Sequence, residues 1–115
     1  MRTALAVLSL AAAVLAMPAA AQAATAAPDV FLLPDKGYCI ACHQVPEGAG
    51  PRTRADLGPP LEGARMRSLG RARIREIIED PVRANLDTTM PPYGRHRILD
   101  AAEIQRLVEY LHALP

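Results

Sequence analysis

Aromatic side chains are scarce in this chain of 115 residues, which contains no Trp, one Phe and three Tyr. A domain of fewer than 100 residues buries only about 60 to 65% of the surface of its unfolded chain. Large aromatic side chains usually supply much of the apolar area buried in a core. The side chains alone therefore make a small hydrophobic core, and we expect a stable fold to need a further apolar group in that core.

Cysteine, strand-forming runs and excess charge are lacking as well. Only two cysteines occur, both within one short motif, so no thiol is left over for a disulfide. No alternating or β-branched run suited to strands occurs, which excludes a β-rich fold. Lys and Arg number 13 against 12 Asp and Glu. Such a balance argues against nucleic acid as a partner, because nucleic-acid binding calls for a basic face.

The one long apolar run lies at the N-terminus, where Arg2 gives a positive start and a stretch of 14 residues, 4–17, follows that is apolar except for Ser9. Ala21-Gln22-Ala23 supplies an A-x-A cleavage site, so residues 1–23 are predicted to be a cleaved secretory signal peptide. The run is shorter than the ~20 residues that span a bilayer, so no stable membrane insertion is expected after cleavage. An uncleaved anchor is the alternative. The expected location is the bacterial periplasm.

The most informative motif is Cys39-Ile40-Ala41-Cys42-His43. Cysteines at i and i+3 of a helical turn can reach the two vinyl groups on one edge of a haem, and the next histidine can bind its iron. The motif predicts one covalent haem c with thioethers at Cys39 and Cys42 and with His43 as an iron ligand. Haem c is attached outside the cytoplasm, so export and motif support each other. Burial of the porphyrin would supply on the order of 10 kcal/mol before entropic costs.

Two other kinds of functional site in proteins use similar cysteine motifs. A thioredoxin-like redox pair needs its two cysteines at a helix start within a βαβ unit, and no strands are predicted here. Structural zinc needs four ligands, and only His96 and His112 remain besides the motif. Haem c is the preferred interpretation.

The chain after residue 23 divides into a short arm and one domain. Residues 24–34, closed by Pro34, are predicted to be an N-terminal arm. Residues 35–115 are predicted to form a single all-α domain of three to four short helices around the haem. Asp35 is expected to cap one or two helical turns that carry the cysteines. Residues 46–60 are rich in Gly and Pro, and they are expected to form a loop.

Two amphipathic helices are predicted beyond this loop. The first covers about ten residues, 69–78, presents its arginines to solvent and ends at Pro81. The second begins with a capping box formed by Asp100 and Glu103. Its apolar stripe consists of Ile104, Leu107, Val108, Leu111 and Leu114. Tyr110 on this helix is expected to pack on Gly37 or Tyr38.

The second iron ligand decides whether a haem protein carries electrons or binds small molecules. Met90 precedes two prolines, which limit the freedom of the segment and favour presentation of the thioether. Met66 is expected to fill the core, since it lies just before a helix. His96 stands between two arginines and His112 lies beside an apolar stripe, so both are weaker alternatives. His43 and Met90 are therefore the predicted axial ligands.

A ligand histidine needs its other ring nitrogen hydrogen-bonded to fix its orientation. A backbone carbonyl of the segment Gly58-Pro59-Pro60-Leu61 is the best candidate acceptor, because this rigid segment follows the cysteine motif.

These motifs together resemble the class I cytochromes c, and more closely the SoxX family, the monohaem subunits of the SoxAX complex of bacterial sulfur oxidation. The matching stretches are residues 37–44, 58–61 and 90–94, followed by Leu99 and residues 108–111. The resemblance implies a class I cytochrome c fold in which the carbonyl of Pro59 accepts a hydrogen bond from His43. Pro34 is a departure, since it restricts the helix that usually precedes the cysteines.

The resemblance also implies a function and partners. The chain would be the non-catalytic electron-transfer subunit of an L-cysteine S-thiosulfotransferase, a complex that joins thiosulfate oxidatively to a cysteine of the SoxYZ carrier. Its partners would be a SoxA-like subunit with one or two haems and a small acceptor cytochrome c. The alternative is a free periplasmic cytochrome c that carries electrons between respiratory complexes. No catalytic residues are assigned, because no paired carboxylates or Ser/His/Asp arrangement occurs.

Overall fold

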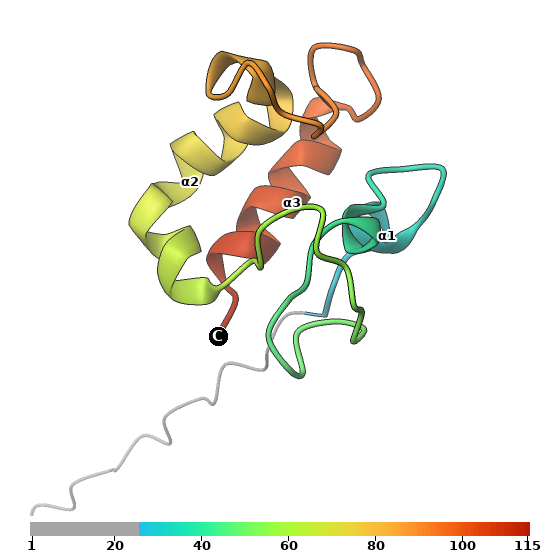
Figure 1. Cartoon of the computed structure of the whole chain (residues 1–115), viewed down its shortest axis with the longest axis vertical. Helices are drawn as coiled ribbons and strands as arrows, with labels where there is room; N and C mark the ends of the chain where they lie inside the picture. The colour runs from blue at the N-terminus through green and yellow to red at the C-terminus, as the bar shows by residue number, and fades with distance from the viewer. Residues whose placement is uncertain (1–25) are drawn as a thin grey trace, which may run out of the picture.

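The computed structural model describes residues 26–115, and all regular structure in this part of the chain is helical. Figure 1 shows three helices: α1 (Asp29–Leu32), α2 (Gly63–Glu79) and α3 (Ala101–His112). Two single 3-10 turns accompany them: η1 (Cys39–Ala41) and η2 (Pro81–Arg83). The predicted all-α class is confirmed. The predicted signal peptide, residues 1–23, lies outside the described residues.

Helix α3 has the predicted start and the predicted apolar face. The Asp100 side chain accepts from the Glu103 backbone N–H at 2.8 Å, and the Glu103 carboxylate accepts from the Asp100 N–H at 2.9 Å. This reciprocal pair is the predicted capping box, and it satisfies two donors that a helix start leaves free. All five residues of the apolar stripe are buried.

Within residues 26–115, no helix is both long enough and apolar enough to cross a bilayer.

Helix α2 begins six residues earlier than predicted, and it is interrupted at Gly70, which has φ 77° and ψ 159°. Only glycine adopts this backbone conformation readily, because a β-carbon would clash with the chain. The interruption turns the helix axis, so Met66 before it and Ile74 after it are both buried. The missed residues, 63–68, contain Met66 as their one large apolar side chain, which is too few for a periodic pattern, so the prediction was too short.

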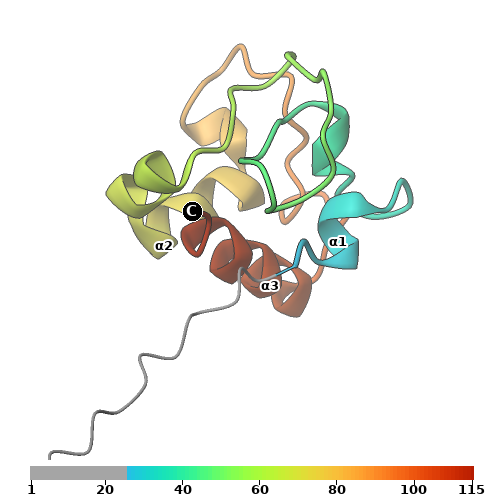
Figure 2. The same ribbon diagram turned by 90° about the horizontal axis from the view of Figure 1, so that it is seen from below.

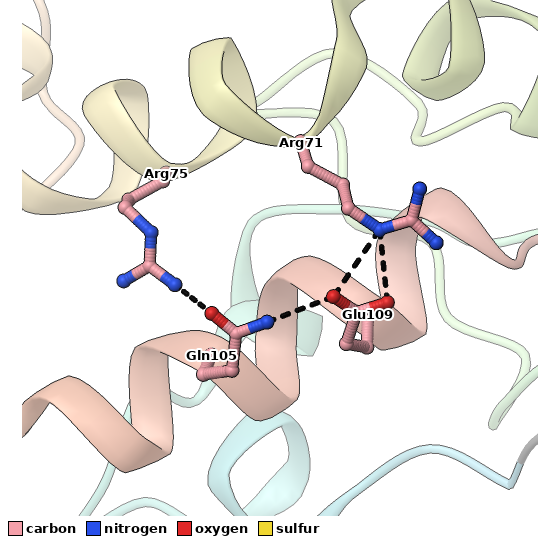
Figure 3. Close-up of polar contacts among 4 residues, drawn as sticks. All are labelled: Arg71, Arg75, Gln105 and Glu109. Carbon is pink, nitrogen blue, oxygen red and sulfur yellow. Dashed lines mark hydrogen bonds and ion pairs between the residues drawn. The ribbon is translucent and has the colours of Figure 1, made fainter.

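Polar side chains join α2 to α3 along their outer edge, as Figure 3 shows. Arg71 Nε donates to both carboxylate oxygens of Glu109, at 3.2 and 3.0 Å. Gln105 donates to Glu109 at 2.8 Å and accepts from Arg75. The arginines are solvent-accessible as predicted, but they also contact the neighbouring helix. Exposed pairs of this kind contribute about 0 to 1 kcal/mol each, so they set the register of two helices that apolar packing holds together.

The N-terminal segment belongs to the core. Val30 and Phe31 lie in α1 and are 3% and 0% exposed, although the sequence places them in the arm 24–34. Phe31 packs edge-on against Tyr110 with ring centroids 5.0 Å apart. The Tyr110 hydroxyl donates to the Ala49 carbonyl at 2.9 Å, so the contacts described for this residue are with Phe31 and Ala49, and the expected contact with Gly37 or Tyr38 stays a prediction. Phe31 is the single Phe of the chain, and its burial against α3 makes residues 29–32 part of the core.

The cysteine segment is less helical than predicted. It contains one 3-10 turn, Cys39–Ala41, in place of one or two turns capped by Asp35. The residue before it, Tyr38, has a left-handed backbone with φ 46°. A bulky side chain rarely adopts this conformation, and a helix cannot continue through it. The turn still provides the spacing of the motif, since the Cys42 N–H donates to the Cys39 carbonyl.

The ion pair between Lys36 and Glu103, 2.7 Å from Nζ to Oε1, makes stability depend on pH. Hydrogen bonds from Lys36 and from the Asp100 backbone lower the pKa of Glu103 below its usual 4.5. A lowered pKa stabilises the fold at pH values above 4.5, and this contribution is lost as the pH falls through the pKa of the folded protein. We expect Glu103→Gln to remove this acid-sensitive part of the unfolding free energy, measured by urea unfolding between pH 7 and 3. Glu109→Gln is the control, and an equal effect of both variants would contradict the assignment.

Candidate haem site

A cavity of about 450 Å³ lies between the helices and the loops that connect them. Figure 2 shows α3 along one side of the molecule, with the green and orange loops toward the opposite side. The apolar walls come from both segments of α2 and from α3: Met66, Leu69, Ile74, Ile77, Ile78, Leu107 and Leu111. The break at Gly70 allows the two segments of α2 to line one cavity.

Both cysteines and His43 line this cavity. Burial raises the pKa of the Cys39 thiol to about 12. A cysteine that works in thiol–disulfide exchange has a lowered pKa, because the thiolate is the reactive form. The described residues also contain no strand from which a thioredoxin-like unit could be built. The structure therefore disfavours a redox pair of cysteines.

His43 is held by one short hydrogen bond. Its Nδ1 lies 2.7 Å from the carbonyl oxygen of Pro59. A carbonyl can only accept, so Nδ1 is the donor in this bond, and Nε2 is the ring nitrogen left to bind a metal. This is the orientation that a metal-binding histidine requires. Backbone hydrogen bonds also join the His43 segment to the Pro59 segment. The Gly58 N–H donates to the Cys42 carbonyl and the Leu61 N–H to the Gln44 carbonyl, both at 2.8 Å.

The His43 ring lies directly on Gly58. A β-carbon added at Gly58 would lie 2.6 Å from Nδ1 and 2.8 Å from Nε2 of the ring. Both distances are far below van der Waals contact, so only glycine fits here. Gly58 and Pro59 thus fix the ring together, one by close contact and the other by its carbonyl.

Met90 lies on the wall of the cavity in the loop after η2 and is half-buried. Its backbone N–H donates to Thr88 Oγ1 at 3.1 Å, and Pro91 follows it. Met66 also lines the cavity, but it is 5% exposed and packed in the core, as predicted. His96 and His112 do not line the cavity. The structure therefore brings His43, Met90 and both cysteines to one cavity and leaves the two other histidines outside it.

Tyr93 is a residue of the site that the sequence analysis did not single out. It lines the cavity, and its hydroxyl donates to the Gly37 carbonyl at 2.7 Å. Burial raises its pKa to about 12, so the hydroxyl stays protonated as a donor. A tyrosine directly after Met90-Pro91-Pro92 was a possible signal, but nothing in the sequence shows that Gly37, 56 residues earlier, is its partner.

The donor set fits a haem. The cavity is largely apolar, it presents an oriented imidazole and a thioether, and two cysteines stand at its edge. Imidazole and thioether are the axial ligands of many c-type haems. Within residues 26–115, no three His, Cys, Asp or Glu side chains come close enough to hold a metal ion by themselves.

Comparison with known families agrees with this chemistry. Residues 35–111, more than half of the chain, match the family described as cytochrome c oxidase, cbb3-type, subunit III. The chain belongs to this family. It is a c-type cytochrome domain, its cofactor is haem c, and its role is electron transfer. No curated protein and no solved structure gives a significant match to the chain.

The contact between Gly58 and His43 can be tested by Gly58→Ala. The added methyl group must displace the ring, so we expect loss of most of the low-spin haem signal in the absorption spectrum and less haem per protein. Loss of an outer hydrogen-bond partner typically costs 10- to 100-fold in metal affinity. Gly48→Ala is the control: it lies at φ 82° with no atom within 4 Å of the added carbon. Its backbone strain should cost ~1 kcal/mol of stability and leave the spectrum intact. Equal spectra for the two variants would contradict the assignment.

Proposed function

We propose that the protein is a one-electron carrier with a single haem c, bound by thioethers to Cys39 and Cys42 and by His43 and Met90 at the iron. The observation that supports it best is the cavity itself, which has these four side chains on its wall. Haem iron supplies the chemistry, because it alternates between the ferric and ferrous states. The protein's residues would hold it and exclude water, with His43 and Met90 as the two iron ligands.

Described features of the structure support these roles. His43 keeps its Nε2 available because the Pro59 carbonyl binds Nδ1. The apolar walls of α2 and α3 exclude water, which lowers the cost of reorganisation when charge changes. A methionine ligand raises the reduction potential relative to a second histidine, and two protein ligands leave no site open for oxygen. These properties suit electron transfer and not catalysis.

For the partner we propose a SoxA-like subunit, so that the protein would be the electron-transfer subunit of a SoxAX-type complex. Electrons released when thiosulfate is joined to the SoxYZ carrier would pass through it to a small acceptor cytochrome c. Support comes from the matching stretches around the cysteines, Pro59 and Met90. The proposed location is the periplasm, with the predicted signal peptide removed.

The family match favours a second candidate. Its description names a subunit of a cbb3-type cytochrome c oxidase. A free periplasmic cytochrome that carries electrons between respiratory complexes would share this domain and the same haem site. The two candidates differ in partner and not in chemistry.

The axial ligand can be tested by Met90→Ala. Without the thioether, we expect loss of the near-infrared Met-to-iron band and a lower reduction potential, measured by absorption spectroscopy and redox titration. Met66→Leu is the matched control, because it replaces the other methionine of the cavity with a side chain of similar volume. It should keep the band. A band that survives in Met90→Ala and disappears in Met66→Leu would identify Met66 as the ligand.

The partner can be tested by affinity capture of the tagged protein from its source cells grown on thiosulfate. We expect a second haem-staining chain to copurify on a denaturing gel, where only covalently attached haem remains with the polypeptide. Deletion of the gene should abolish thiosulfate oxidation. Normal thiosulfate turnover together with slower reduction of a terminal oxidase would favour the second candidate. Loss of haem stain from the protein's own band would contradict covalent attachment.

A further inference from the structure

One buried hydrogen bond joins the two segments that carry the proposed axial ligands. Tyr93, three residues after Met90, donates from its hydroxyl to the carbonyl of Gly37, two residues before Cys39, at 2.7 Å. Tyr93 is only 9% exposed and Gly37 is buried. The bond therefore links the Met90 segment to the cysteine segment across the domain.

The acceptor side of this bond is rigid. The Gly37 N–H donates to the Val30 carbonyl at 3.0 Å, and Val30 is 3% exposed. A β-carbon at Gly37 would lie 2.6 Å from that carbonyl oxygen, so the backbone segments around Gly37 and Val30 are in close contact. Gly37 is thus fixed to the core helix α1 and gives Tyr93 a stationary acceptor.

The donor side is equally well anchored. The Tyr93 carbonyl accepts from the backbone N–H groups of Ile98 and Leu99, at 2.9 and 3.1 Å. The next two residues, 94 and 95, donate their backbone N–H groups to the Glu79 carbonyl at the end of α2. Pro91 and Pro92 stand between Tyr93 and Met90 and restrict the backbone there. A displacement of Tyr93 is therefore transmitted to Met90.

The chain before Met90 lacks such an anchor. The hydrogen bonds described for residues 84–90 all reach back four residues or fewer along the chain, to Pro81, Asn85 or Thr88. Leu86 in this stretch is 84% exposed. Of the hydrogen bonds described for residues 84–93, only the one made by the Tyr93 hydroxyl joins this loop to the cysteine segment.

We propose that the Tyr93–Gly37 hydrogen bond is a latch that keeps the Met90 side of the iron closed to small ligands. The proposal rests on the proposed His43 and Met90 coordination. Tyr93 is a positioning residue: it acts through the placement of Met90, and it decides whether the domain remains an electron carrier or opens to ligand binding.

The test is the rate at which imidazole binds the ferric holoprotein, followed by stopped-flow absorption. At saturating imidazole this rate equals the rate at which Met90 leaves the iron. We expect Tyr93→Phe to raise the saturating rate about tenfold, which corresponds to about 1.4 kcal/mol and to the loss of one buried hydrogen bond. Tyr93→4-aminophenylalanine, which retains a donor at the same place, should restore the slower rate.

Tyr110→Phe is the matched control. It also removes a buried tyrosine hydroxyl from a backbone carbonyl, that of Ala49, but Tyr110 does not line the cavity. We expect both Phe variants to unfold at lower denaturant and only Tyr93→Phe to bind imidazole faster. Equal rates in the two variants would overturn the latch and leave Met90 coordination intact. A wild-type protein without a Met-to-iron band would overturn the coordination, and the latch with it.

Discussion

The packing of α2 against α3 is the constraint on which the rest of the structure depends. With one Phe and no Trp, the chain builds its largest apolar surface from the aliphatic side chains of these two helices. That surface is both the core of the protein and the wall of the cavity, since Met66, Ile74 and Leu107 serve both purposes. A haem bound in this cavity would contact the same side chains and so extend the core.

The loops attach to this wall and bring the donor atoms to it. The segment around Gly58 fixes the His43 ring from one side by close contact and by the Pro59 carbonyl. The loop that carries Met90 returns to the cysteine segment through Tyr93. His43 is thus held directly by a neighbouring segment, whereas Met90 makes a local hydrogen bond to Thr88 and its loop is joined to the cysteine segment through Tyr93.

Most of the fold and the candidate ligands could be predicted because they depend on local patterns. The capping box of α3 and its apolar stripe are set within one helix, and the cysteine motif spans five residues. The errors concern contacts or conformations that no local pattern records. The break at Gly70 has no periodic signal, the Tyr38 backbone is unusual for its residue type, and no local pattern pairs Tyr110 with Phe31.

The sequence by itself determined the helical class, the haem chemistry of the cysteine motif and the choice of His43 and Met90 as candidate ligands. These follow from residue type and short spacing, which act before the chain is folded. Only the tertiary structure decided that Phe31 belongs to the core, that Gly58 supports His43, and that Tyr93 ties the Met90 loop to Gly37. Each of these joins residues that are distant along the chain, or depends on a space that exists only once the helices have packed.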